Sequence, residues 1–155
     1  MNYLGFKPEK IENTAEELNQ LLANYQVYYQ NLRNYHWNIS GEHFFDLHEE
    51  FETLYNEAKI NIDEIAERIL TLRMKPVSTL AEYLEMADVK EYSTEDSVDM
   101  VRSILSDHKK LIANMRKLLE VASDANDEGT IDMIAGFLGS VEKNSWMLDA
   151  WITNQ

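Results

Sequence analysis

Residues 36–55 read HWNISGEHFFDLHEEFETLY, and the same segment continues to Asp63 and Glu67. From Phe44 to about Met74 the sequence contains neither glycine nor proline, and apolar residues recur every three or four positions. This pattern predicts one long α-helix. One face of that helix is continuously apolar, so it needs other helices to cover it, and the chain is predicted to fold around it.

The predicted helix carries two different faces. Each residue of an α-helix advances by about 100° and 1.5 Å. A core-facing stripe is formed by Leu47, Phe51, Leu54, Ala58, Ile62, Ile65, Ile69 and Leu72. Four potential metal ligands, His48, Glu52, Asp63 and Glu67, point roughly 140° away from that stripe. Phe45, Ala66 and Leu70 share their sector, and a purely solvated face would not need these apolar residues.

Distance separates these four ligands into two pairs. His48 and Glu52 lie one turn apart, as do Asp63 and Glu67, but His48 and Asp63 are about 22 Å apart along the axis. One metal ion therefore cannot be bound by both pairs of a single chain. Two copies packed antiparallel about a twofold axis would bring opposite pairs together at two identical sites. The alternative is an ordinary solvated face, on which acids at four-residue spacing are common.

The motifs of this stretch closely resemble the signature of the Dps family (DNA-binding protein from starved cells), the mini-ferritins. The matching residues are His36-Trp37-Asn38-Ile39-x-Gly41, Phe44-x-x-Leu47-His48-Glu49-x-Phe51, Tyr55 and Asp63-x-x-Ala66-Glu67-Arg68. The resemblance extends over most of the chain. It implies a shell of twelve four-helix subunits, in which Fe(II) is oxidised by hydrogen peroxide, the preferred oxidant, or by dioxygen, and is stored as Fe(III).

The resemblance also implies which residues bind iron. His36, His48 and Glu52 of one subunit, with Asp63 and Glu67 of its partner, would form a dinuclear iron site at each twofold interface. Glu52 departs from the best-known members, which usually have aspartate there. Its extra methylene lets the carboxylate reach further, and the ligand type is kept.

The rest of the chain predicts a ferritin-like arrangement of helices. Pro8 fits a helix start, and an apolar stripe then ends at His36, so the first helix is predicted over about 8–38. Pro76 breaks the second helix, and Thr79-x-x-Glu82 is a capping box for a short helix to about Met86. Two helical hairpins joined by one long crossover are typical of ferritin-like bundles. We expect an all-α, ferritin-like four-helix bundle with a short extra helix in the crossover, forming one domain over 1–155.

The boundaries of the second hairpin follow from caps and periodicity. Ser93 or Thr94 is predicted to cap the third helix. A short loop over 124–129 then leads to the fourth helix, whose apolar stripe runs to Ile152. His108 lies on the apolar stripe of the third helix, where we expect a hydrogen-bonded core histidine rather than a second metal site.

Composition and charge restrict the function. The net charge is −14, which attracts cations and opposes direct binding of DNA. The first twenty residues are not the lysine-rich and arginine-rich tail by which some Dps relatives bind DNA. Cysteine is absent, which fits a cytoplasmic location, and no apolar run suggests a signal peptide or a membrane span.

Three other features of the sequence bear on its chemistry. None of the four histidines has glutamate three residues before it, so the Glu-x-x-His motif of an intrasubunit di-iron site is absent. Trp37 adjoins His36 and is either an electron donor or an aromatic that packs an interface. Asp127 and Asp132 are candidates for an acidic pore lining, although acids are common at helix starts.

We therefore predict a homo-oligomeric, dodecameric iron-storage ferroxidase. Two alternatives remain open. One is a nucleoid-binding protein that protects DNA physically, and the other is a structural shell without iron chemistry. All three share one fold, so the fold cannot choose among them.

Overall fold

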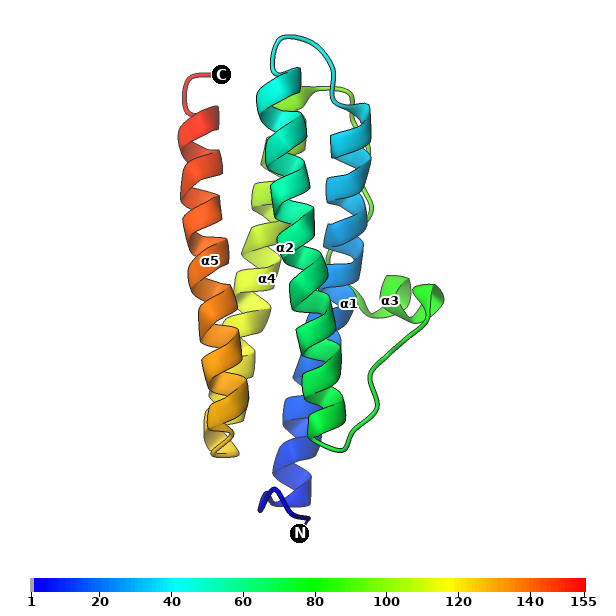
Figure 1. The fold of residues 1–155 in the computed structure, drawn as a ribbon, viewed down its shortest axis with the longest axis vertical. Coiled ribbons are helices and arrows are strands. Elements are labelled where there is room, and N and C mark those ends of the chain that lie inside the picture. The colour runs from blue at the N-terminus through cyan, green and yellow to red at the C-terminus, as the bar shows by residue number, and fades with distance from the viewer. Residues whose placement is uncertain (1) are drawn as a thin grey trace.

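The computed structural model describes residues 2–155, and within them every regular element is a helix. The helices are α1 (Pro8–Asn38), α2 (Phe44–Thr71), α3 (Leu80–Met86), α4 (Ser97–Asp124) and α5 (Glu128–Ile152). Figure 1 shows α1, α2, α4 and α5 side by side as a bundle, with α3 outside it, next to α1. The predicted all-α four-helix bundle, with a short extra helix in the crossover, is confirmed.

The long connection between α2 and α4 sets the topology. Helices α1 and α2 form one antiparallel hairpin, and α4 and α5 form the other (Figure 1). Because α2 ends at the opposite end of the bundle from the start of α4, the chain has to cross the full length of the bundle. Helix α3 lies in this crossover, and its N-cap Thr79 accepts a bond from Glu82 N at 3.3 Å, as the capping box predicts.

The core is built from the predicted apolar stripes. The stripe of α2 is buried at Leu47, Phe51, Leu54, Ala58, Ile65, Ile69 and Leu72, while Ile62 is half-buried. Asn61 is also buried on this helix, and its side-chain amide donates a hydrogen bond to Tyr25 Oη at 3.3 Å. A buried amide needs such a partner, and sequence periodicity gave no sign of it.

Two helix boundaries differ from the prediction. Helix α2 ends at Thr71, before Met74, because Arg73 adopts a left-handed conformation with φ 66° and Met74 N donates back to Ile69 O. Helix α4 is capped by Asp96, whose carboxylate accepts from Asp99 N at 2.8 Å. Thr94 instead accepts from Asp96 N, so the predicted caps Ser93 and Thr94 were wrong.

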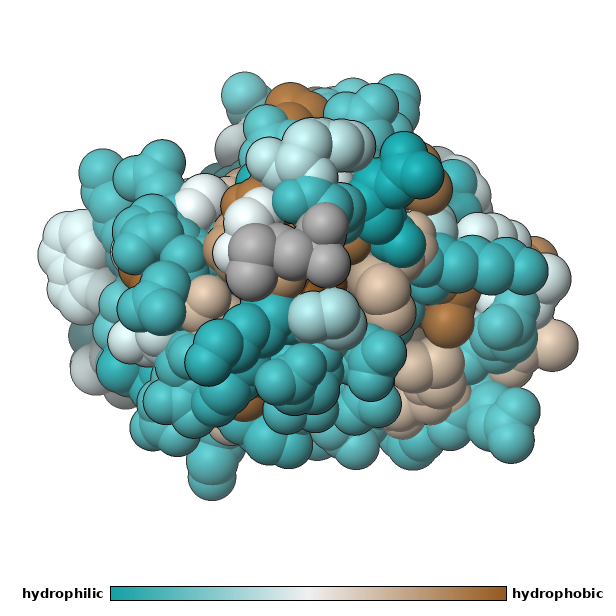
Figure 2. Space-filling view, turned by 90° about the horizontal axis from the view of Figure 1, so that it is seen from below, coloured by the Kyte–Doolittle hydropathy of each residue, from teal (hydrophilic) through white to brown (hydrophobic). Residues whose placement is uncertain are grey.

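The end of the bundle where the chain begins has a mainly hydrophilic surface (Figure 2). Figure 2 views the end of the bundle where α1 begins, and hydrophilic residues dominate that face. None of the helices described over 2–155 is long and apolar enough to cross a membrane.

Candidate metal centre

His36 and His48 lie together where the α1–α2 hairpin turns. Their rings stack at a centroid distance of 3.8 Å and an interplanar angle of 14°. His36 Nδ1 lies 2.7 Å from the backbone oxygen of His48, and His48 Nδ1 lies 2.8 Å from the backbone oxygen of His36. Phe44 stacks on the other side of His48 at 4.7 Å. Both rings are therefore fixed by packing and by a reciprocal pair of bonds.

These reciprocal bonds decide which nitrogen of each ring is available. A carbonyl oxygen only accepts, so Nδ1 of each histidine must carry the proton and donate. In the neutral ring the Nε2 atom is then an unprotonated acceptor, which is the form that binds metal ions. A backbone carbonyl that orients a histidine in this way is a common support of metal sites. The pair therefore presents two oriented nitrogen ligands.

Tyr55 connects Glu52 to this histidine pair, because it contacts both His36 and Glu52. The Tyr55 ring meets the His36 ring edge-on at 5.2 Å, and its hydroxyl donates to Glu52 Oε1 at 3.4 Å. Partial burial and the neighbouring Glu52 carboxylate raise the pKa of Tyr55, so its phenol stays neutral. The Glu52 side chain is exposed and free to turn toward a metal ion.

Asp63 and Glu67 lie on the same helix but further along it, toward the opposite end of the bundle. Both side chains are exposed. Of the apolar residues predicted to share their sector, Phe45 is 84% exposed and Leu70 is 56% exposed, while Ala66 is half-buried. Over residues 2–155, no three histidine, aspartate or glutamate side chains gather closely enough to hold a metal ion. One chain thus presents separate groups of ligands.

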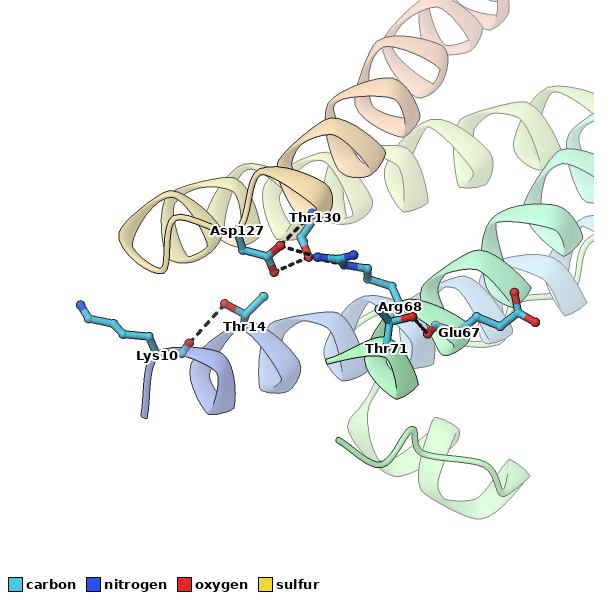
Figure 3. Close-up of polar contacts among 7 residues, drawn as sticks. All are labelled: Lys10, Thr14, Glu67, Arg68, Thr71, Asp127 and Thr130. Atoms are coloured by element: carbon cyan, nitrogen blue, oxygen red, sulfur yellow. Dashed lines mark hydrogen bonds and ion pairs between the residues drawn. The ribbon is translucent and has the colours of Figure 1, made fainter. Parts of the chain in front are cut away.

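Asp127 is placed differently from its predicted role. Its side chain is fully buried, and it accepts from Arg68 Nη2 at 2.5 Å and from the Thr130 backbone and hydroxyl. Figure 3 shows Arg68 reaching from α2 to Asp127, while Glu67 beside it points away. Within the chain Asp127 therefore joins α2 to the start of α5, and its carboxylate does not face solvent. Asp132 is exposed, and its pore role stays a prediction.

The remaining candidates are also located. Trp37 is 62% exposed, and its ring lies 5.4 Å from the Arg33 guanidinium carbon. Its predicted role stays a prediction. His108 is buried between Tyr28 Oη and Ser145 Oγ, each at 2.8 Å, so the expectation of a hydrogen-bonded core histidine is confirmed.

The arrangement of helices defines the class of protein, a ferritin-like four-helix bundle. The ferritin-like domain model matches residues 15–155. A solved structure described as a Dps protein from Vibrio cholerae O1, "a member of a broad superfamily of ferritin-like diiron-carboxylate proteins", has a TM-score of 0.95. It is 40% identical and the match covers 98% of this chain and 96% of that one.

Curated relatives narrow this class to a family. "DNA protection during starvation protein 2" of Bacillus anthracis is 41% identical, over 91% of this chain and 97% of its own length. "DNA protection during starvation protein" of Porphyromonas gingivalis is 42% identical, over 96% of this chain and 94% of its own length. The chain belongs to the Dps family.

Proposed function

We propose that this protein takes Fe(II) as its substrate, oxidises it with hydrogen peroxide at sites shared between two copies, and stores the Fe(III) product in a hollow, dodecameric shell. The observation that carries the proposal is the reciprocal bonding of His36 and His48. It orients two imidazole rings so that their Nε2 atoms are available as ligands. Imidazole together with carboxylate oxygen suits Fe(II), and positions left open admit an oxidant.

The sharing of each site is supported by how the ligands are distributed on α2. His48 and Glu52 lie near one end of the helix and Asp63 and Glu67 toward the other, all exposed or half-buried. An antiparallel twofold contact would place the acids of one copy opposite the histidines of the other. The exposed apolar residues beside the ligands favour such a contact over a solvated face.

A site that holds two Fe(II) ions suits the reduction of hydrogen peroxide, because this reduction needs two electrons. Hydrogen peroxide takes up two electrons when its O–O bond breaks to give water, and two Fe(II) ions supply one each. His36, His48 and Glu52 would hold one ion, while Asp63 and Glu67 would complete the shell and bring the second ion close. Because both electrons arrive together, hydroxyl radical is not released.

The charge supports a role in handling cations over direct binding of DNA. A net charge of −14 repels the phosphate backbone and concentrates Fe(II) near the surface. Several relatives are named for DNA protection, and removal of iron and peroxide would protect DNA without contact. A gel shift at low salt without Mg²⁺ separates the two routes: a retarded DNA band would favour physical binding.

The test is Fe(II) oxidation followed optically after anaerobic loading and addition of peroxide. Wild type should oxidise iron rapidly, and His48→Ala and Asp63→Ala should each lose this rate while their shells remain intact. Glu64→Ala, which alters the same helix at an exposed position outside the ligand sector, is the control. If both ligand variants matched wild type, the proposed ligands would be wrong. A wild type no faster than free iron would favour the structural shell.

A further inference from the structure

Tyr55 contacts two candidate ligands, yet the proposed oxidation of paired irons gives it no role. Its ring lies 5.2 Å from the His36 ring, and its hydroxyl lies 3.4 Å from Glu52 Oε1. Of the tyrosines within residues 2–155, no other makes a ring contact with His36 or His48. Phenols are among the side chains that most readily give up one electron, so this position is chemically suited to redox work.

A series of aromatic rings leads away from Tyr55. Tyr29 meets it edge-on at 5.9 Å, and the Arg33 guanidinium lies 4.4 Å from the Tyr29 ring centroid and 5.4 Å from the Trp37 ring. A cation over a ring disfavours removal of an electron from that ring, because the product would be positive. The Glu52 carboxylate beside Tyr55 has the opposite effect. Electrostatics therefore favours Tyr55 over Tyr29 and Trp37 as the residue that is oxidised.

We propose that Tyr55 supplies the second electron when hydrogen peroxide reaches a site that holds a single Fe(II). This inference rests on the proposed ferroxidase function. One Fe(II), one hydrogen peroxide, one Tyr55 phenol and one proton from solvent give one Fe(III), one neutral Tyr55 radical and two water molecules. The O–O bond breaks, Fe(II) and the phenol are each oxidised by one electron, and the phenolic proton ends in water.

Oxidation of Tyr55 would matter most when the shell contains too little iron to fill its sites. With too little iron to fill both positions, a one-electron reaction would release hydroxyl radical. Oxidation of Tyr55 completes the two-electron reduction and retains the oxidising equivalent on the protein.

The experiment uses assembled wild-type protein loaded anaerobically with fewer Fe(II) ions than sites, treated with hydrogen peroxide and frozen rapidly for electron paramagnetic resonance. We expect a tyrosyl signal that changes its hyperfine pattern when ring-deuterated tyrosine is incorporated. Tyr55→Phe, which keeps the ring against His36, should lose the signal. Tyr35→Phe is the matched control, because Tyr35 neighbours His36 in sequence but packs on Phe51 and bonds Ser103.

Mass spectrometry of the wild type after the same reaction gives a second readout that needs no variant. The oxidised residue should be Tyr55. A signal that persists in Tyr55→Phe, or oxidation found on Tyr29 or Trp37 in its place, would overturn the inference. If filled wild-type sites oxidise iron rapidly but iron-poor sites give no tyrosyl radical, this inference alone fails. If filled sites do not accelerate oxidation, the proposed function fails with it.

Discussion

At the scale of single residues, the most informative contacts are those that fix which ring nitrogen of a histidine carries a proton. His36 and His48 each donate from Nδ1 to the other's backbone oxygen, so the chain orients both Nε2 atoms before any metal arrives. His108 is fixed in a similar way. Ser145 donates its hydroxyl proton to Val141 O at 2.7 Å and must accept from His108 Nδ1, which leaves Nε2 to accept from the hydroxyl of Tyr28.

His108 should make stability depend on pH. Burial lowers its pKa from 6.5 to about 4, so between these values the unfolded chain binds more protons than the folded chain. The free energy of unfolding should therefore fall as pH drops through this window, by on the order of 3 kcal/mol for this group. Unfolding of wild type and His108→Gln, followed from pH 7 to pH 4, measures the difference.

The difference between the two curves isolates His108. Burial raises the pKa of Asp107 to about 6, which gives the opposite slope, but Asp107 is present in both proteins and cancels. The variant should lose less stability than wild type on acidification. Parallel curves would show that His108 is not buried in its neutral form.

Gly129 makes room for the ion pair of Arg68 and Asp127. A Cβ atom at this position would lie 2.7 Å from Arg68 Nη2 and 2.9 Å from its Cζ, and the guanidinium is held by Asp127 and Thr130. Gly129→Ala should therefore lower the free energy of unfolding by about 1–3 kcal/mol. Gly136→Ala, with no atom within 4 Å, should raise it by about 0.5–1 kcal/mol. Equal thermal midpoints for the two variants would contradict this account.

At the scale of elements, side-chain amides on α1 hold the long crossover against the bundle. Asn19 bonds Lys75 O and Val77 N, and Asn24 Oδ1 accepts from the backbone of residues 88 and 89. Further along, Asn31 donates to Lys90 O, and Asn34 donates to Tyr92 O. This segment has little regular structure of its own, so these bonds satisfy backbone groups that a helix would otherwise pair.

Asn24 should be the most important of these amides, because it is fully buried. Besides accepting from Asp88 N at 2.8 Å and Val89 N at 3.2 Å, it donates to Asn114 Oδ1 at 2.9 Å. Asn24→Ala leaves these groups unpaired and should lower the free energy of unfolding by about 2–3 kcal/mol. Hydrogen exchange at the amides of 88 and 89 should become faster.

Asn34→Ala is the comparison, since Asn34 makes its bonds at the surface, where water can replace the amide. Its effect should stay within about 0.5 kcal/mol. An Asn24→Ala protein with unchanged exchange at 88 and 89 would show that the crossover is held by other contacts.

The bundle itself could be predicted because apolar periodicity reports which side of each helix is buried. Three kinds of detail could not. The asparagines of α1 look like solvated polar residues until the crossover is placed over them. The Asp127 carboxylate reads as an acidic helix start, and only the packing of α2 against α5 buries it with Arg68. The N-cap of α4 is Asp96, whereas Ser93 or Thr94 was predicted, because several neighbouring residues are chemically able to cap a helix.

At the scale of the whole molecule, α2 carries exposed apolar residues on the same face as its candidate ligands. Phe45 and Leu70 are 84% and 56% exposed on the helix that carries Asp63 and Glu67. Exposed apolar residues next to potential ligands, on a chain of net charge −14, fit a surface covered by another copy. Membership of the Dps family likewise leads us to expect that several copies of this chain assemble.

Phe45→Asp and Leu70→Asp should each reduce assembly, because a charge would be buried in the contact without a partner. Analytical ultracentrifugation should show a shift from a large assembly to small species, with helix content retained. Tyr3→Asp changes a residue that is 79% exposed but distant in sequence from the ligands, and serves as the control. Assemblies unaffected by either α2 variant would place the contact elsewhere.

The most direct test of the shared site is complementation between two inactive chains. His48→Ala lacks one end of the site, and the double variant Asp63→Ala, Glu67→Ala lacks the other. If the site is shared, each mixed pair of chains contains one intact site, so random co-assembly should restore about a quarter of the sites and a matching fraction of peroxide-driven Fe(II) oxidation. Co-assembled shells as inactive as either parent would contradict the account, because the ligands of two chains would then not combine in one site.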